Sequence, residues 1–149
     1  MELVAGANTI IPTSPINIEI QIFGVEASEL DFSAYSLAEN AKVRGDDDMI
    51  FYGQLHNKAQ TIKLTQAIAS VSFQINLAEV SPQINKIAIC ATLADERKNF
   101  SSVNHLNIRI KNPDTIATSK ISGQNRSEVA LIIGEFSIRQ DEDGRYSLA

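Results

Sequence analysis

The sequence predicts an all-β fold, an antiparallel two-sheet β-sandwich with short helical turns in its connections. Three observations predict it: apolar residues at every second position, two longer apolar segments rich in strand-forming residues, and turn-forming residues between them. Successive side chains of a strand point to opposite faces, so a two-residue period gathers apolar groups on one face. A helix would instead show spacings of three and four residues.

The alternating segments carry the clearest signal. In PINIEIQIFG, isoleucines at positions 16, 18, 20 and 22 alternate with polar residues. The same period recurs in VSFQINL (residues 71–77) and in LNIRIK (residues 106–111). Each segment is therefore predicted to be a strand with one face in the core.

Two segments are apolar on both faces, residues 87–93 and residues 129–138. Such runs predict central strands that are covered on both sides. By periodicity alone the second run fits a buried helix as well, but its valine, isoleucine and phenylalanine content favours a strand. The expected core residues are Ile18, Ile20, Ile22, Phe51, Phe73, Ile75, Ile89, Ile108, Leu131 and Ile133.

Glycine and proline residues, which end strands, predict where the connections lie. Gly24 closes the first strong strand, and Pro82 and Pro113 interrupt later connections. Residues 78–84 fit one helical turn, and Asp143 with Gly144 fits a tight hairpin turn. The 149 residues are enough for one domain with a substantial core, so residues 1–149 are predicted to form a single domain.

Composition narrows the function. The 13 Lys and Arg residues are scattered and the net charge is −5, which argues against a nucleic-acid partner. The apolar runs are too short for direct membrane insertion. The first residues lack the pattern of a signal peptide, and a single cysteine allows no intrachain disulfide. We therefore expect a cytoplasmic location.

Acidic residues concentrate in one part of the chain. Asp46, Asp47 and Asp48 stand in KVRGDDDMIFYGQ, Glu29 and Asp31 stand just upstream, and no carboxylate follows Asp48 until position 79. Calcium takes six to eight oxygen ligands. If Asp46 and Asp48 lie on the lead-in to a strand, they share a face, and Glu29 and Asp31 share one by the same argument. These four carboxylates predict a weak or vestigial calcium site, to which Asn57, backbone carbonyls or water would add ligands.

The alternative interpretation of the same residues is a solvated acidic turn. Lys42 and Arg44 flank the run and would relieve its charge, with Arg44 as an ion-pair partner. The sequence leaves both interpretations open.

Other reactive residues fit structural roles better. Cys90 lies in an apolar segment without an adjacent cation, which is typical of an inert buried thiol, although a redox role is the alternative. His56 and His105 lack the further ligands of a zinc site and are expected on the surface. Glu135 is expected to have a partner, Arg109 or Arg139. No nucleophile–base pair is recognisable in the sequence, so we expect no enzyme.

Six segments in register resemble the TerD-type bacterial stress proteins, the tellurite-resistance family. They are LVAGANT, LDFSAYSL, KVRGDDDMIFYGQ, NKIAICATL after Pro82, NFSSVNHLNIRI and SEVALIIGEFSIR. Two features depart from the family pattern. Glu29 stands where the family has Asp, and the glycine- and acid-rich insert typical of calcium-binding members is missing after FYGQ. The chain is thus similar to the divergent, TerA-like members.

The resemblance implies a β-sandwich and a cytoplasmic role in tellurite or general stress resistance. It further implies a non-catalytic module that binds related stress-resistance proteins, and a homo-oligomer is compatible with it. Exposed edge strands would offer a route to such pairing. The alternative function is a genuine calcium-dependent sensor or small-ligand-binding module.

Overall fold

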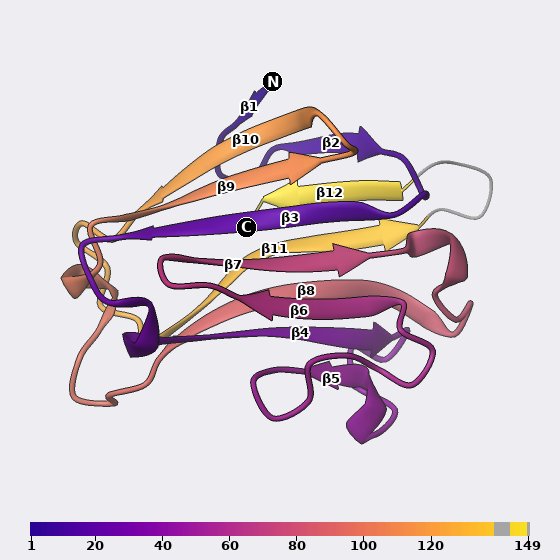
Figure 1. The fold of residues 1–149 in the computed structure, drawn as a ribbon, viewed down its shortest axis with the longest axis horizontal. Coiled ribbons are helices and arrows are strands. Elements are labelled where there is room, and N and C mark those ends of the chain that lie inside the picture. Colours follow the sequence, from indigo (N-terminus) through magenta and orange to yellow (C-terminus); the bar gives the residue numbers. More distant parts are fainter. Residues whose placement is uncertain (139–143, 149) are drawn as a thin grey trace.

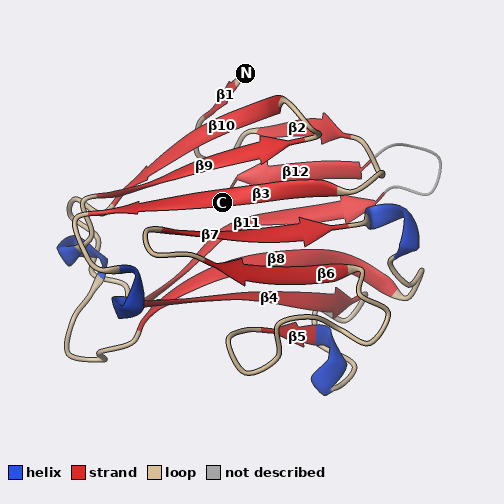
Figure 2. Cartoon of the chain, in the orientation of Figure 1, coloured by secondary structure: helices blue, strands red, loops and turns tan. Residues whose placement is uncertain are grey.

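The protein is described by a computed structural model, which covers residues 1–138 and 144–148. It contains two six-stranded sheets that pack face to face (Figures 1 and 2). In sheet order, the first sheet is β1 (Glu2–Leu3), β10 (Thr115–Ser122), β9 (His105–Lys111), β3 (Ile16–Phe23), β7 (Ser70–Ile75) and β6 (Ile62–Gln66). The second sheet is β2 (Asn8–Ile11), β12 (Gly144–Leu148), β11 (Ala130–Ile138), β8 (Ile84–Leu93), β4 (Leu30–Ala38) and β5 (Met49–Ile50).

Within residues 1–138 and 144–148, the connections carry four short 3₁₀ helices. These are η1 (Ala27–Glu29), η2 (Asp46–Asp48), η3 (Leu77–Glu79) and η4 (Phe100–Ser102). The predicted all-β sandwich with short helical turns is confirmed, and η3 begins one residue before the turn expected from the sequence. One pairing is not antiparallel, because β1 lies parallel to β10.

The core lies between the inner faces of the two sheets. Eight of the ten expected core residues are buried: Ile18, Ile20, Ile22, Phe73, Ile75, Ile89, Ile108 and Ile133. Leu131 is half-buried and packs against the core, whereas Phe51 is half-buried and lies outside it, so the assignment of Phe51 was wrong. Phe51 lies in the turn that follows β5, at the margin of the sandwich, where fewer side chains cover it.

Strand β11 was expected to be covered on both faces, and this is also wrong. Its neighbours are β8 and β12, but within the described residues no layer covers the face that points away from the first sheet. Ile132 lies on that face and is 51% exposed. A register shift between Ile132 and Gly134 accommodates Ile133 as an extra residue, which is buried. The hairpin pairing of β11 with β12 is present, and Asp143 of its predicted turn lies outside the described residues.

Strand β4 positions the candidate site. It pairs with β8 along its length, and its other edge pairs with the two-residue strand β5. Glu29 and Asp31 lie where β4 begins, and the residues around η2 lie next to its second half (Figure 1). No helix within residues 1–138 and 144–148 is long and apolar enough to cross a membrane.

Candidate functional site

The run of three aspartates forms η2 within what we term the acidic loop, residues 44–58. η2 follows Gly45 and ends at Met49, where β5 begins. After β5, residues 51–54 form a tight turn in which Phe51 and Gln54 exchange backbone hydrogen bonds of 3.0 and 2.9 Å. The Gln54 side chain folds back and donates to the carbonyl oxygens of Asp46 and Met49, at 2.7 and 2.6 Å. The loop is therefore closed on itself.

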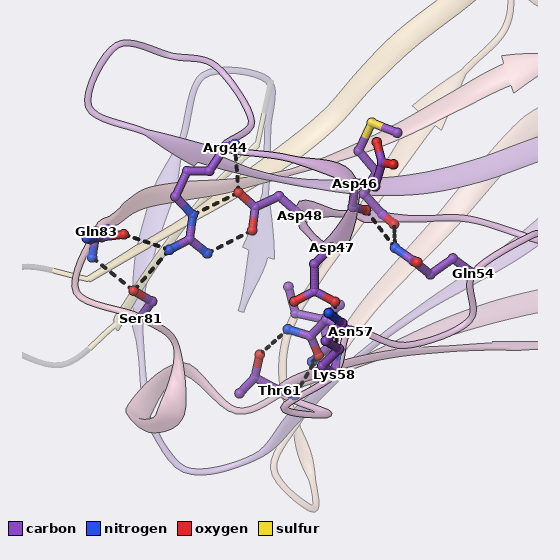
Figure 3. Close-up of polar contacts among 12 residues, drawn as sticks. Arg44, Asp46, Asp47, Asp48, Gln54, Asn57, Lys58, Thr61, Ser81 and Gln83 are labelled. Carbon is purple, nitrogen blue, oxygen red and sulfur yellow. Dashed lines mark hydrogen bonds and ion pairs between the residues drawn. The ribbon is translucent and has the colours of Figure 1, made fainter.

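Arg44 and Asp48 form the centre of the loop (Figure 3). The Arg44 guanidinium donates to both Asp48 oxygens, Nε to Oδ2 at 2.9 Å and Nη2 to Oδ1 at 2.8 Å. The Arg44 backbone N–H also donates to Oδ2, at 2.8 Å. Asp48 is only 5% exposed, so this bidentate pair compensates the loss of its hydration. The hydrogen bonds from Arg44 hold the pKa of the Asp48 carboxyl below its ordinary value, although burial opposes the shift.

Arg44 also reaches a distant part of the chain. Its Nη1 donates to Ser81 Oγ at 3.2 Å and to Gln83 Oε1 at 3.0 Å. Residues 81–83 lead directly into β8, so Arg44 ties η2 to the entry of a central strand (Figure 3). The expected role of Arg44 as an ion-pair partner is confirmed.

The other two aspartates point elsewhere. A 3₁₀ helix has three residues per turn, so three consecutive side chains point in three directions. Asp47 accepts the Lys58 backbone N–H at 2.9 Å, and Figure 3 shows Asp46 directed away from both Asp47 and Asp48. The Asp46 side chain makes none of the hydrogen bonds or ion pairs found in the described part of the chain. The expected strand lead-in, with Asp46 and Asp48 on one face, is wrong because the segment is helical.

Asn57, a further candidate ligand, has a structural role. Its Oδ1 accepts the backbone N–H groups of Thr61 and Ile62, at 2.9 and 3.3 Å, and its Nδ2 donates to Thr61 Oγ1 at 2.7 Å. These bonds close the loop that enters β6. Its amide oxygen is therefore engaged inside the protein.

Glu29 and Asp31 are not brought to the aspartate run. The register that pairs Tyr35 with Met49 places Asp48 beside Ser36, and at about 3.3 Å per residue Asp31 lies roughly 16 Å away. Glu29 is bound instead by Lys98, Nζ to Oε1 at 2.8 Å, and it accepts the Glu26 backbone N–H at 3.1 Å. These contacts, that with Lys98 above all, lower the pKa of Glu29.

The four predicted carboxylates thus do not form one ligand set. Asp48 is bound by a guanidinium and Glu29 by an ammonium group, and neither oxygen pair is free for a cation. Within the described residues, no group of three or more His, Cys, Asp or Glu side chains has an arrangement that holds a metal ion. The residues present do not fit the six to eight oxygens of a calcium shell.

The acidic loop does border an open hollow of about 640 Å³. Asp46, Asp47 and Asp48 line it together with Arg44, Gln54, His56, Lys58 and Gln83. The hollow therefore presents both signs of charge. Such a surface suits polar contacts with a partner of mixed charge better than capture of a single ion.

The other candidates lie elsewhere. Cys90 is half-buried on the outer face of β8, and burial raises the pKa of its thiol, with a smaller contribution from Glu135. The partner of Glu135 is Lys86, Nζ to Oε2 at 3.2 Å, and not Arg109. Arg109 lies in the other sheet, beside Glu19. The second predicted partner, Arg139, lies outside the described residues.

The two histidines are far apart in the fold. His56 lies in the acidic loop and is exposed, as expected. His105 begins β9 and stacks on Phe23, with ring centroids 4.4 Å apart. Burial by its surroundings, and secondarily Lys120, lowers the pKa of His105.

Comparison with known proteins identifies the family. A family model described as the TerD domain matches residues 13–143. The chain belongs to the TerD family. Relatives include tellurium resistance protein TerA from Alcaligenes sp., 37% identical over 91 residues, which are 58% of this chain and 26% of that protein. Tellurium resistance protein TerD from Serratia marcescens is 32% identical over 120 residues, which are 72% of this chain and 62% of that protein.

The matched part therefore spans about a quarter of the TerA relative and less than two thirds of the TerD relative.

Solved structures share the fold. A homologue of the telluride resistance protein TerD from Streptomyces coelicolor A3(2) superposes with a TM-score of 0.69, at 13% identity, over 91% of this chain and 88% of that one. A protein of unknown function gives a TM-score of 0.71 at 12% identity, over 91% and 87%.

Several residues of the site carry no sequence signal of their own. Ser81 and Gln83 meet Arg44 only because the fold brings residues 37 and 39 positions apart together. Gln54 is part of the FYGQ segment that supports the family resemblance, but its two carbonyl contacts depend on the local turn.

Proposed function

We propose that this TerD-family chain is a non-catalytic module of a bacterial tellurite- and stress-resistance system. It acts in the cytoplasm by binding related stress-resistance proteins. Family membership supports a role in tellurite resistance, because TerD-family relatives are named for tellurium resistance. The observation that carries the mode of action is the acidic loop, whose charged groups hold the loop together rather than converge on a reaction centre.

The lengths of the relatives are consistent with a module that acts by binding other proteins. The chain matches only part of the TerA and TerD proteins, so its domain corresponds to one part of a larger protein in those cases. A domain within a longer chain contacts its neighbours through interfaces that resemble transient protein–protein interfaces.

The test combines a phenotype with partner identification. The gene is deleted from its host, and growth is measured on graded potassium tellurite with the chain restored or withheld. In parallel, cross-linking in living cells and mass spectrometry identify the proteins in contact with the chain. We expect lower tellurite tolerance in the deletion strain and cross-links to other TerD-family proteins. Unchanged tolerance with no family protein cross-linked would contradict the proposal.

The alternative function is a calcium-dependent sensor. Asp46 supports it, because its carboxylate borders the 640 Å³ hollow and is not engaged by another described side chain. Among the three aspartates of η2, a cation there would have only the Asp46 carboxylate free of described contacts, so carbonyls and water would have to supply the other ligands. Calorimetric titration of EDTA-treated protein tests it, with magnesium and Asp46→Ala as controls. Since so few ligands are available, we expect no saturable calcium heat below millimolar concentration; saturable heat that Asp46→Ala abolishes would establish the sensor.

A further inference from the structure

The outer face of the first sheet carries a polar hollow of about 320 Å³. It lies over β3, β9 and β10, which are neighbours in that sheet and lie side by side in Figure 1. Along each of these strands every second residue is buried in the core, so the side chains around the hollow are those that point outward. Ile108 and Ser119 border the hollow as well, but they belong to the buried set.

The strand register arranges six outward side chains of the hollow in two rows across the three strands. The first row is Gln21, Asn107 and Lys120, and the second row is Glu19, Arg109 and Thr118. Residues directly opposite on neighbouring strands have Cβ atoms about 4.5–5.5 Å apart, so the polar groups of each row are within reach of one small ligand. Glu2 of β1 stands opposite Thr118 and closes the hollow on that side.

Most of these polar groups are not engaged by the protein. The carboxamides of Gln21 and Asn107 are half-buried, yet neither makes any of the side-chain hydrogen bonds found within the described residues. Arg109 meets Glu19 at 4.0 Å, which is too long for a hydrogen bond. Lys120 takes part in none of the ion pairs formed between described residues. Four neighbouring donor side chains are therefore available to a ligand.

The charge around the hollow favours an anion of low charge. Lys111 Nζ donates to Glu19 Oε2 at 3.2 Å, so the carboxylate of Glu19 is compensated from outside the hollow. Three cations, Arg109, Lys111 and Lys120, thus stand against two carboxylates, Glu2 and Glu19, in a chain whose net charge is −5. The surplus of one positive charge matches a single carboxylate, whereas a doubly charged phosphate would be repelled more strongly by the two glutamates.

The lining also limits what the rest of the ligand can be. All outward-facing residues around the hollow are polar or charged, so an apolar ligand would displace their water without replacing its hydrogen bonds. Carboxamides both donate and accept hydrogen bonds, as hydroxyl groups do. A guanidinium group binds a carboxylate through two parallel N–H···O bonds. The volume of the hollow lies at the lower end of the range for small-molecule sites.

We propose that this hollow binds a small polyhydroxy monocarboxylate, which is a sugar acid. Its carboxylate lies between Arg109 and Lys120, and its hydroxyl groups bond to the carboxamides of Gln21 and Asn107. Glu19, held in place by Lys111, accepts a hydrogen bond from a further hydroxyl group. The site lies on the sheet that does not contain β5 and the acidic loop, and it does not depend on the proposed function.

The probe is gluconate, which is titrated into ¹⁵N-labelled protein at low ionic strength. The chemical shifts of the side-chain N–H groups of Gln21, Asn107 and Arg109 are followed. We expect saturable shifts of these groups with a Kd of about 1–10 mM, because the contacts are polar and partly solvated. Glucitol lacks the carboxylate and hexanoate lacks the hydroxyl groups, so each should bind at least about tenfold more weakly than gluconate.

Variants of the chain localise the binding. Arg109→Gln should weaken gluconate binding about tenfold, because the bidentate contact is lost. Lys120→Gln should weaken it about two- to fivefold, since it removes an exposed charge. Lys63→Gln is the matched control, because Lys63 points outward from β6 in the same sheet but does not border the hollow, and it should leave binding unchanged. These side chains lie outside the core, so Tm should stay the same in all three variants.

The proposal is overturned if gluconate produces no saturable shift up to about 50 mM, or if the shifts avoid Gln21, Asn107 and Arg109. Glucitol or hexanoate that binds as tightly as gluconate would overturn it too, because one half of the ligand would then be irrelevant. Equal effects of Lys120→Gln and Lys63→Gln would show that general charge, and not this hollow, attracts the anion. Inorganic phosphate that binds at the same side chains more tightly than gluconate would likewise contradict the proposed ligand.

Discussion

Replacing Arg44 with methionine should destabilise the fold, because it leaves a buried carboxylate without its partner. Asp48 loses two guanidinium hydrogen bonds, and Ser81 and Gln83 lose one each. Methionine preserves much of the side-chain length, so the effect reports the lost charge rather than a cavity.

The magnitude follows from the exposure of the two partners. Removing one member of a fully buried ion pair costs about 3–5 kcal/mol. The Arg44 side chain is 38% exposed, so water reaches part of the pair and the cost is lower. We expect the free energy of unfolding to fall by about 2–3 kcal/mol. For a chain of this length each kcal/mol lowers Tm by about 2–4 °C, so Tm should fall by about 4–12 °C.

The decisive test is how the free energy of unfolding depends on pH. It is measured by denaturant unfolding of the original protein and of Arg44→Met between pH 3 and pH 7. Arg44 keeps the folded-state pKa of Asp48 below 3.8. A carboxyl whose pKa is lower in the folded than in the unfolded protein stabilises the fold at pH values above its unfolded-state pKa. This contribution is lost as the pH falls through its folded-state pKa. In the variant, burial without the arginine favours protonation of Asp48. The difference between the two proteins should therefore be full at neutral pH and shrink in acid.

Two controls accompany this prediction. Arg97→Met removes the exposed ion pair with Asp95 and should leave the free energy of unfolding nearly unchanged. The double variant Arg44→Met/Asp48→Leu should regain part of the loss, because no charge then remains buried. The reasoning is refuted if Arg44→Met costs no more than Arg97→Met, or if its cost is the same at pH 3 and pH 7.

Further predictions concern packing and thiol reactivity. Gly123→Ala should cost about 1–3 kcal/mol in chemical unfolding, because a Cβ there would overlap the carbonyl oxygen of Val103. Gly45→Ala meets open space and is its control; equal costs would show that the close approach is unimportant. The Cys90 thiol should react slowly with a disulfide reagent at pH 7, because burial, and to a smaller extent the charge of Glu135, raises its pKa. Glu135→Gln should speed this reaction and shift its pH profile to lower pH, and an unchanged profile would exclude the contribution of Glu135.

The sequence predicted those strands in which one face is apolar and the other polar. β3 and β9 show this contrast because their outer faces carry Glu19, Gln21 and Arg109. β10 has the same geometry but was not recognised. Its inward positions include Ala117 and Ser119, which are small or polar, so the alternation is weak. Two-sided burial was overestimated for β11, because an apolar run does not reveal whether a second layer covers it.

The candidate site was less predictable, for a local and a long-range reason. Locally, the direction of three consecutive aspartates depends on whether they extend or turn, and the 3₁₀ turn separates them. At long range, β4 holds Glu29 and Asp31 apart from Asp48 by the length of half a strand. Arg44 was identifiable as a partner from the sequence because it stands four residues from Asp48, within reach of a single turn.

The acidic loop and strand β5 are parts of one arrangement. Arg44 fixes η2 against residues 81 and 83, and Gln54 fixes the turn after β5 against η2. Together these contacts determine where β5 begins and where it leaves β4. β5 accordingly meets β4 at Ala34 and Tyr35, where Ile50 and Met49 pair with them. The charges that suggest a metal site thus have a structural role, because they hold η2 and the start of β5 in place.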